Sequence, residues 1–513
     1  MQRLTLLVLV FFTWYSASAQ DSSARFPIHP GEYAAAPSSQ QLHNYLRESQ
    51  VWIGPEMRDD FNAIELAIGY DKGNWIDAQG ADKVRTLTAR TEGKTSFNKF
   101  SIWGEFKYHR ALEDSTSLRH QTRINADAPV YFGAHRRNYY ERDVYSLAAV
   151  GQYGLQDYRW PITLGMDYRV GNHFSNNDPR GKINDFQLNS YLSIGHQADT
   201  WSVHMGGIAG YGRERISVDY KNDKYKENTA DPLYINWYMN GFGRATRRLN
   251  NQNYNDDFLR YGARLHASLR TPWGNLKGTL EALREEQKFK IYDTSPQTYS
   301  LLNHYTKDRY DLDLLWSTIS EGDVQSNLRI QAGMIDGFDF NYELMRNNYT
   351  YRQEYARFHF LLKRHKTEWH LGAEFASTSQ HDGSMAIWQK NQFIEPVAGL
   401  RYGFALADRQ TIHPQIQGGY RHPFSAQLTF PEGLAGDFSE TIILYNAAYL
   451  STPSAFVNIS ADYQFRRDAK TAIGVKLDTQ YRWRTASPVQ QQHPTHWPGT
   501  DRWHSALTLG YYF

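Results

Sequence analysis

The sequence predicts an all-β fold: a transmembrane antiparallel up-and-down β-barrel of about 18 strands, with long external loops and short periplasmic turns. Three observations support this. Apolar and polar residues alternate with a period of two over long runs, the connections between these runs are alternately short and long, and an aromatic strand ends the chain at Phe513. The elements follow in chain order.

Residues 1–19 read as a cleavable secretory signal peptide. Arg3 supplies the positive charge, residues 4–12 form the apolar core, and residues 17–19 are a small-residue cleavage site before Gln20. The apolar run is too short for a membrane-spanning helix. The chain contains no cysteine, which excludes lipid anchoring, disulfides and thiolate metal sites.

Residues 20–61 form the next predicted unit, an N-terminal segment that precedes the first strand. Within it, residues 39–50 carry Leu42, Tyr45 and Leu46 at helical spacing, and Ser39 is a suitable N-cap. We expect a short helix here. The segment forms either a periplasmic strap across the barrel mouth or a small plug in the lumen, and the sequence leaves both open.

Residues 62–513 carry the predicted barrel. In residues 159–170, Trp160, Leu164 and Tyr168 fall on one face, while Gly165 and Asp167 fall on the other. Residues 258–270 and 473–483 alternate in the same way. Soluble sandwiches also alternate, but runs this long match the roughly 9–11 residues that a tilted transmembrane strand needs.

The connections predict the topology. Longer gaps, among them residues 110–141, 213–256 and 421–454, separate short turns, as in barrels with external loops and periplasmic turns. Two weak strand-like runs, residues 233–245 and 441–450, are placed in external loops. The tight turns are expected near residues 93–94, 156–157, 197–198, 272–273, 321–322, 364–365, 407–408 and 467–468.

Composition agrees with a membrane barrel. The 36 tyrosines are a large excess, and Tyr and Trp concentrate where a membrane meets water. A formal net charge of +2 gives no argument for a nucleic-acid partner. The predicted location is the outer membrane of a Gram-negative cell, with outer-membrane lipid and lipopolysaccharide as the surroundings.

The closing strand, residues 503–513, with its terminal aromatic Phe513, is similar to the sorting signal of Gram-negative outer-membrane β-barrels. The whole mature chain resembles an uncharacterised outer-membrane β-barrel protein family of Bacteroidota. The motifs are residues 100–108 (FSIWGEFKY), residues 175–180 (SNNDPR) and the closing strand. The resemblance implies location and fold, and no established substrate.

Polar residues on the predicted inner face are the candidates for solute binding. On one strand, Arg260, Arg264 and Arg270 form a basic ladder suited to carboxylate or phosphate. The alternative is a wall of mutually satisfied ion pairs, which any wide barrel has. The binding candidates are Arg260, Arg264, His266, Arg270, Arg357, His370, Glu374 and Arg401.

An enzymatic function has less support in the sequence than solute binding. His173 and Ser175 share a strand face, loosely similar to outer-membrane phospholipase A and lipid A deacylase, but the third, orienting group is not identifiable. We therefore expect no enzyme, no catalytic residue and no cofactor. We also expect no metal site at His493, His496 and His504, or at His370 with its neighbours Glu368 and Glu374.

The predicted function is a non-enzymatic integral barrel: a passive channel, a solute-binding barrel, or the membrane component of an uptake system. A second possibility is a structural barrel whose Tyr-rich external loops dock a surface lipoprotein or a transporter. A rim hydrolase acting on lipid is the third.

Overall fold

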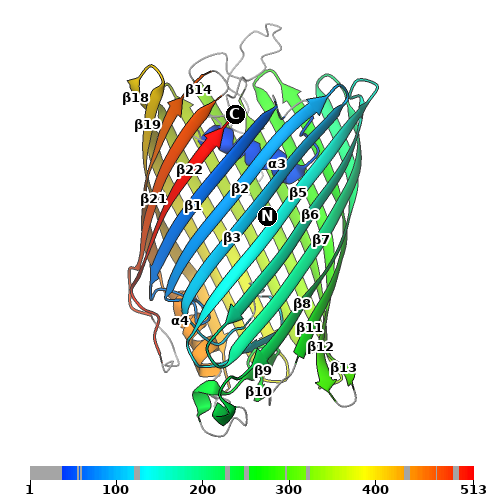
Figure 1. The fold of residues 1–513 in the computed structure, drawn as a ribbon, viewed down its shortest axis with the longest axis vertical. Coiled ribbons are helices and arrows are strands. Elements are labelled where there is room, and N and C mark those ends of the chain that lie inside the picture. Colours follow the sequence, from blue (N-terminus) through cyan, green and yellow to red (C-terminus); the bar gives the residue numbers. More distant parts are fainter. Residues whose placement is uncertain are drawn as a thin grey trace.

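A computed structural model describes residues 37–54, 57, 60–120, 127–225, 231–247, 253–294, 297–318, 324–431, 439–468, 471–488 and 496–513. They form a closed antiparallel β-barrel (Figure 1). The closure is made by β1 (Phe61–Gly73) and β22 (Asp501–Tyr512), which pair with each other as well as with their sequence neighbours. Because every wall strand is paired on both sides, the backbone polar groups are satisfied without a sheet edge. The predicted signal peptide lies outside the described residues.

The wall has 18 strands, as predicted, since two of its 19 hydrogen-bonded segments, β17 and β18, are one strand interrupted at Gly403. Between β1 and β22 the wall consists of β2 (Lys83–Phe97), β3 (Phe100–Thr116), β5 (Asn138–Leu155), β6 (Trp160–Ser175), β7 (Arg180–Gln197), β8 (Trp201–Asp219), β11 (Asn253–Thr271), β12 (Gly274–Thr294), β13 (Gln297–Ser317), β14 (Val324–Asn341), β15 (Tyr349–Arg364), β16 (Thr367–Asp382), β17 (Ile387–Tyr402), β18 (Phe404–Ala407), β19 (Gln410–Thr429), β20 (Ser454–Arg466) and β21 (Ala472–Arg484).

The two ends of the barrel differ in their connections, as predicted. One end, called here the turn end, carries the short connections and the C-terminus, at the top of Figure 1. The other, the loop end, carries the long connections. The predicted turns near 156–157, 197–198, 272–273, 364–365, 407–408 and 467–468 all lie between wall strands at the turn end. The turn predicted near 321–322 lies outside the described residues.

The turn predicted near residues 93–94 is wrong. Gly93 and Lys94 lie inside β2, which continues to Phe97, and the turn is formed by Asn98 and Lys99. Asn98 takes up the positive φ of 55° that the turn needs. Lys94 instead points into the lumen, where its Nζ donates to the carbonyl oxygens of Gly54 and Met57.

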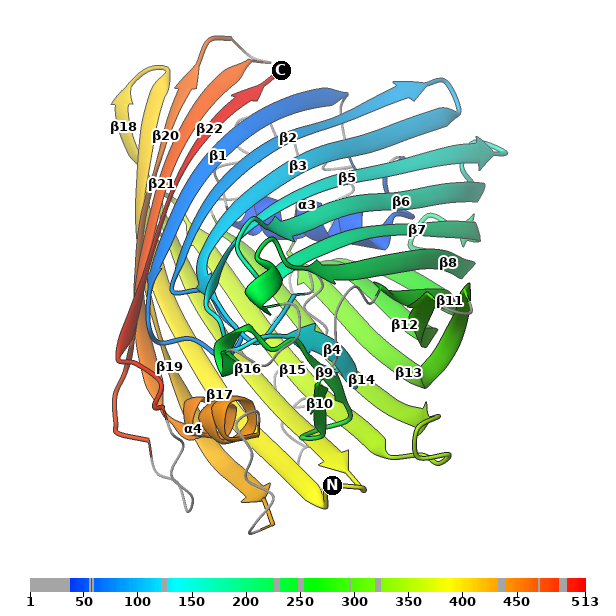
Figure 2. The same ribbon diagram turned by 60° about the horizontal axis from the view of Figure 1, so that its bottom comes forward.

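The long loops carry small elements of their own, at the end of the barrel that comes forward in Figure 2. A separate three-stranded sheet has the order β10 (Ala245–Arg247), β9 (Trp237–Asn240), β4 (Val130–Gly133). Residues 233–245 are thus outside the wall, as predicted. Residues 441–450 are also outside it, but they are helical: a π-helical turn η4 (Ser439–Leu444) leads into α4 (Tyr445–Ser451). The loops also hold the short 3₁₀ turns η2 (Asp223–Tyr225) and η3 (Pro232–Tyr234).

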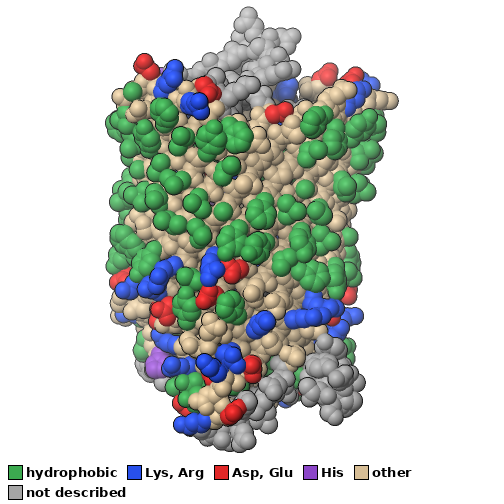
Figure 3. All heavy atoms as spheres, in the orientation of Figure 1, with side chains coloured by type: hydrophobic (Ala, Val, Ile, Leu, Met, Phe, Trp, Pro, Cys, Tyr) green, Lys and Arg blue, Asp and Glu red, His purple; other side chains and the backbone are tan. Residues whose placement is uncertain are grey.

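The outer surface is apolar over the part of the wall nearest the turn end (Figure 3). Trp160, Leu265 and Tyr511, from the strands whose alternation predicted a lipid-facing side, are 41%, 43% and 39% exposed. Single exposed apolar side chains are ordinary, but a continuous belt around a closed barrel marks a membrane-spanning surface. No helix among the described residues is long and apolar enough to span a bilayer.

Toward the loop end the strands run beyond the apolar belt and their outward faces become charged (Figure 3). Ion pairs link neighbouring strands there: Arg110 with Glu141 at 2.5 Å, Arg284 with Asp308 at 2.6 Å, and Arg213 with Asp257. Outward charges are costly within hydrocarbon and favourable at its polar boundary. The change of surface therefore marks one edge of the membrane.

Candidate functional site

A helix, α3 (Pro37–Ser49), lies inside the barrel near the turn end (Figure 2). Arg47 forms an ion pair with Glu105 of β3 at 2.9 Å, and Glu48 forms one with Arg329 of β14 at 2.5 Å. Since β3 and β14 are separated by many wall strands in both directions, these two ion pairs hold α3 across the lumen.

The chain continues from α3 into a short apolar stretch that packs on the lumen wall. Trp52 is 3% exposed; its ring stacks on Tyr45 at 5.6 Å and meets His266 of β11 edge-on, also at 5.6 Å. Val51 and Gly54 are bound by Gln152 of β5, which donates to the Val51 carbonyl at 2.5 Å and accepts from the Gly54 amide at 2.9 Å. We call residues 37–57, as far as they are described, the lumen segment.

At the loop end the lumen is filled by the loops. Phe132 of β4 stacks on Tyr254 of β11 and on Tyr238 of β9, with ring centroids 3.6 and 5.4 Å apart. Around them lies a buried cluster that joins the small sheet to the loop-end halves of the wall strands; its members are Val130, Phe132, Ile183, Ile216, Tyr238, Tyr254, Phe289, Ile291, Leu302, Tyr305, Tyr349 and Tyr351. We call this set the loop-end cluster.

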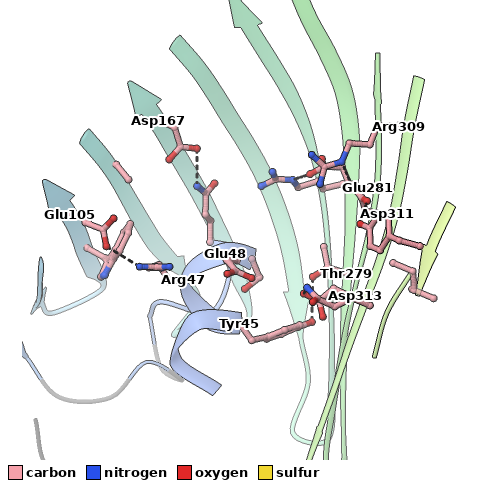
Figure 4. Close-up of a pocket in the computed structure, with 18 residues that line it drawn as sticks. Tyr45, Arg47, Glu48, Glu105, Asp167, Thr279, Glu281, Arg309, Asp311 and Asp313 are labelled. Atoms are coloured by element: carbon pink, nitrogen blue, oxygen red, sulfur yellow. Dashed lines mark hydrogen bonds and ion pairs between the residues drawn. The ribbon is translucent and has the colours of Figure 1, made fainter. Parts of the chain in front are cut away.

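Between the lumen segment and the loop-end cluster lie two cavities of about 480 and 310 Å³. Figure 4 shows the residues that line the first of them. Both are lined by Gln50, Asp167, Arg264, Glu281 and Arg309, so they adjoin, and together they are called here the chamber. Its size is that of a pocket for a small molecule. The lumen segment forms one wall of the chamber, and the barrel strands form the rest.

The chamber is strongly charged. Seven carboxylates and five cationic side chains line the two cavities: Glu48, Glu105, Asp167, Glu281, Glu285, Asp311 and Asp313 against Arg47, Arg260, Arg264, Lys307 and Arg309. Six of the carboxylates form ion pairs, with Arg47, Arg260, Arg264, Arg309 or Arg329. The seventh, Asp167, forms none among the described residues; it accepts a hydrogen bond from the Gln50 amide at 3.4 Å.

The predicted basic ladder on β11 is divided by the structure. Arg260 and Arg264 line the chamber, but each faces a glutamate across the strand pair, Glu285 and Glu281, and forms an ion pair with it. Arg270 lies exposed at the turn end of the same strand. Two of the three arginines are therefore neutralised by the next strand, which removes the strongly basic surface that their spacing suggested.

The remaining predicted binding residues lie outside the chamber lining. His266 is fully buried beneath Trp52, between the hydroxyl groups of Tyr191 and Thr279, each 3.0 Å away. Further round the wall, Arg357 of β15 pairs with Glu374 of β16 at 3.2 Å.

Two predicted residues, His370 of β16 and Arg401 of β17, occupy another part of the lumen wall. Arg401 is buried and lies 3.4 Å from Glu368 and 3.6 Å from Asp462. A role in binding for the eight predicted residues stays a prediction.

Sequence reasoning did not single out the residues that distinguish the chamber. Asp167 lies on the polar face of a strand whose alternation was recognised, so its inward direction was visible from the sequence. Its lack of an ion pair was not visible. Gln50 and Glu48 come from the N-terminal segment, whose place in the lumen the sequence left open.

Ser175 and His173, the residues considered for catalysis, make structural contacts with their own neighbours. The Ser175 hydroxyl donates to the Asn177 carbonyl and accepts from its amide, both at 3.2 Å, so it caps a tight loop. His173 is buried against Tyr140 and lies 3.5 Å from Glu113. In the part of the chain that is described, no group of three or more His, Asp or Glu side chains has the geometry of a metal site, and His493 lies outside that part.

Residues 52–513 match a family of unknown function, DUF6850. No curated protein sequence matches the chain.

Several solved barrels are similar in structure. BauA, the ferric preacinetobactin receptor from Acinetobacter baumannii, is 7% identical with a TM-score of 0.38, over 89% of this chain and 80% of that one. The FrpB iron transporter from Neisseria meningitidis (F3-3 variant) is 10% identical with a TM-score of 0.38, over 91% and 83%. The outer membrane protein OpdK from Pseudomonas aeruginosa is 10% identical with a TM-score of 0.36, over 89% and 99%. Such distant similarity concerns barrel architecture and indicates no substrate.

Proposed function

Because the chain belongs to the DUF6850 family, whose function is unknown, we propose a role from its geometry: a gated, solute-binding β-barrel of the outer membrane. A small polar solute would be held in the chamber. It would pass on when the lumen segment moves aside. The observation that carries this proposal is the chamber itself, a charged space of small-molecule size bounded on one side by a segment that is not part of the wall.

The way the lumen segment is held supports a movable plug. Its described residues lead into β1 at Phe61 and form no strand pairing with the wall. Ion pairs at Arg47 and Glu48, hydrogen bonds from Gln152 and Lys94, and one apolar patch around Trp52 hold it in place. These contacts can be lost without breaking any strand pairing, so the barrel wall would stay closed while the lumen opens.

For the membrane orientation, we propose that the turn end faces the periplasm and that residues 1–19 direct export. The charged outer faces beyond the apolar belt would then lie at the external leaflet, where lipopolysaccharide carries phosphates and sugars. Strands that extend past the hydrocarbon on the loop side support this assignment. Placement among proteins of Bacteroidota stays a prediction.

A non-enzymatic role is part of the proposal. The hydroxyl of Ser175 is used by its own loop, and His173 is buried inside the barrel rather than at a surface that lipid reaches. Neither arrangement favours a rim hydrolase. The contacts to Asn177 support a structural function for Ser175.

Conductance across a planar lipid bilayer tests the gate. We expect the wild-type protein to conduct weakly, and a variant lacking residues 37–53 to conduct steadily, because the deletion empties one side of the chamber without touching the wall. Heat-modifiable migration on gels should show that both barrels are folded. A wild-type protein that already conducts at the level of the deletion variant would contradict a gate, as would a deletion that leaves conductance unchanged.

A further inference from the structure

The chamber contains one carboxylate without an ion-pair partner among the described residues. Six of its seven lining carboxylates have an arginine within ion-pair distance, whereas Asp167, exposed to the chamber on β6, has none among the described residues. Arg329, just outside the lining, pairs with two of these carboxylates, so Asp167 is the one that stands apart. A charged group without a counter-charge in a confined space favours a ligand of opposite sign.

The neighbour of Asp167, Gln50, carries an acceptor atom without a donor. Gln50 is only 6% exposed, lines both cavities, and its Oε1 has no hydrogen-bond partner, while its Nε2 donates to Asp167 at 3.4 Å. A buried carbonyl oxygen without a partner is costly. Together the two side chains offer acceptors in surplus, so the group that completes them must bring N–H or O–H donors and positive charge.

Aromatic faces in the same lining suit an organic cation. The Arg264 guanidinium lies over the Tyr191 ring at 5.3 Å, and Arg329 lies over Tyr45 at 5.6 Å, so the lumen already places cations on ring faces. Trp103 and Tyr355 also line the chamber. A hard metal ion fits less well, because Asp167 and the Gln50 oxygen supply far fewer than the about six oxygens that such ions require.

We propose that the chamber binds a small organic cation that carries N–H donors, a primary ammonium or a guanidinium, at Asp167 and Gln50. This inference rests on the proposed function and names its substrate class. An anionic solute is disfavoured, since the arginines of the lining that would hold it are already paired with carboxylates.

Isothermal titration calorimetry on the full-length protein in detergent tests the proposal with agmatine, which carries one ammonium and one guanidinium. We expect wild-type protein to bind agmatine and not butane-1,4-diol. Asp167→Asn keeps the shape and removes the charge, and it should weaken binding at least tenfold. Asp478→Asn is the matched control: it removes the same charge from β21, where Asp478 accepts from Asn458 at 3.3 Å, and should leave the affinity within twofold.

A second variant examines Gln50 without changing any charge. A Cβ at Gly165 would lie 2.8 Å from the Gln50 Oε1, so Gly165→Ala should displace that flexible amide, leave the strand intact and weaken agmatine binding severalfold. Wild-type protein that fails to bind agmatine at millimolar concentration would overturn the proposal, and so would equal affinity of wild type and Asp167→Asn. If an anion such as citrate bound in its place, the substrate class would be wrong while the gated barrel stood.

Discussion

At the turn end the lumen is occupied by a segment that comes from outside the wall, whereas at the loop end it is occupied by loops that begin and end in the wall. Both closures use buried aromatic rings. The turn end has Tyr45 and Trp52, and the loop end has Phe132, Tyr238 and Tyr254. Both sets of rings lie in buried apolar clusters, but at the turn end ion pairs from α3 to the wall are added to the apolar contacts.

This difference indicates which closure moves. A loop with both ends in the ladder can leave the lumen only by lengthening its path or breaking wall pairing, which costs hydrogen bonds. The lumen segment, as far as it is described, makes no backbone pairing with the wall. Its contacts are side-chain contacts, so its docking equilibrium responds to single substitutions, while the wall and the loop-end cluster stay in place.

The largest effect is expected from Trp52→Ala. Removing a large buried aromatic side chain costs about 3–5 kcal/mol, which changes a docking equilibrium by on the order of 100-fold or more. Because the chain has no cysteine, Ser49→Cys gives a unique reporter within the lumen segment. In that background we expect Trp52→Ala to accelerate labelling of Cys at position 49 by a water-soluble maleimide, and to raise conductance.

The matched control for that experiment is Trp75→Ala. Trp75 is also 3% exposed, but it packs at the loop end, on Tyr449 of α4 at 4.7 Å. It should leave labelling at position 49 unchanged. Equal acceleration by both substitutions would mean that the two closures are one cooperative unit, and the comparison between them would fail.

A smaller effect is expected from Arg329→Gln. Arg329 bridges Glu48 of the lumen segment and Asp313 of the wall, both at 2.5 Å. Since the Glu48 side chain is half exposed, the loss for docking should be about 1 kcal/mol, or roughly fivefold in open probability. Arg482→Gln breaks a wall ion pair with Glu395 that no lumen-segment residue shares, and single-channel recording should show no change.

The wall was predictable from the sequence because its signal is local. A side-chain period of two places Leu265 outward and Arg264 inward, whichever strand lies beside them. Because lipid contacts the outward side, residues on that side are apolar along the part of the strand that spans the membrane. Most turns were predictable too, several of them because they carry Asp or Pro. The wrong prediction at Gly93 and Lys94 has the same local origin. A glycine often indicates a turn, but here β2 continues through it.

The chamber was only partly predictable because it depends on pairing between strands. The spacing of Arg260 and Arg264 predicts a basic ladder, but β12 places Glu285 and Glu281 opposite them. The sequence of a single strand does not determine its register with the next strand. Asp167 differs from the other chamber carboxylates because no described arginine lies within ion-pair distance of it. Gln50 could be placed only once the lumen segment was seen to cross between β3 and β14.

The smallest predicted effect is a pH dependence of the lumen segment through His43 on α3. Burial lowers the pKa of this imidazole; the hydrogen bond to Glu92 at 2.7 Å opposes the shift, and Arg47 and Arg90 add to it. The docked state therefore binds fewer protons at His43 than the free segment does. Docking is at full strength above the ordinary histidine pKa of about 6.5 and weakens as the pH falls below it.

Single-channel recording at pH 7.5 and 5.5 should then show open probability rising a few-fold on acidification, below the limit of about tenfold per pH unit for one proton. His43→Gln keeps an N–H donor for Glu92 and cannot titrate, so its open probability should depend less on pH than that of the wild type. The carboxylates of the chamber are common to both proteins and cancel in this difference. An identical pH dependence in the two would mean that His43 does not couple protonation to docking, and would leave the ion pairs and Trp52 as the groups that set the position of the segment.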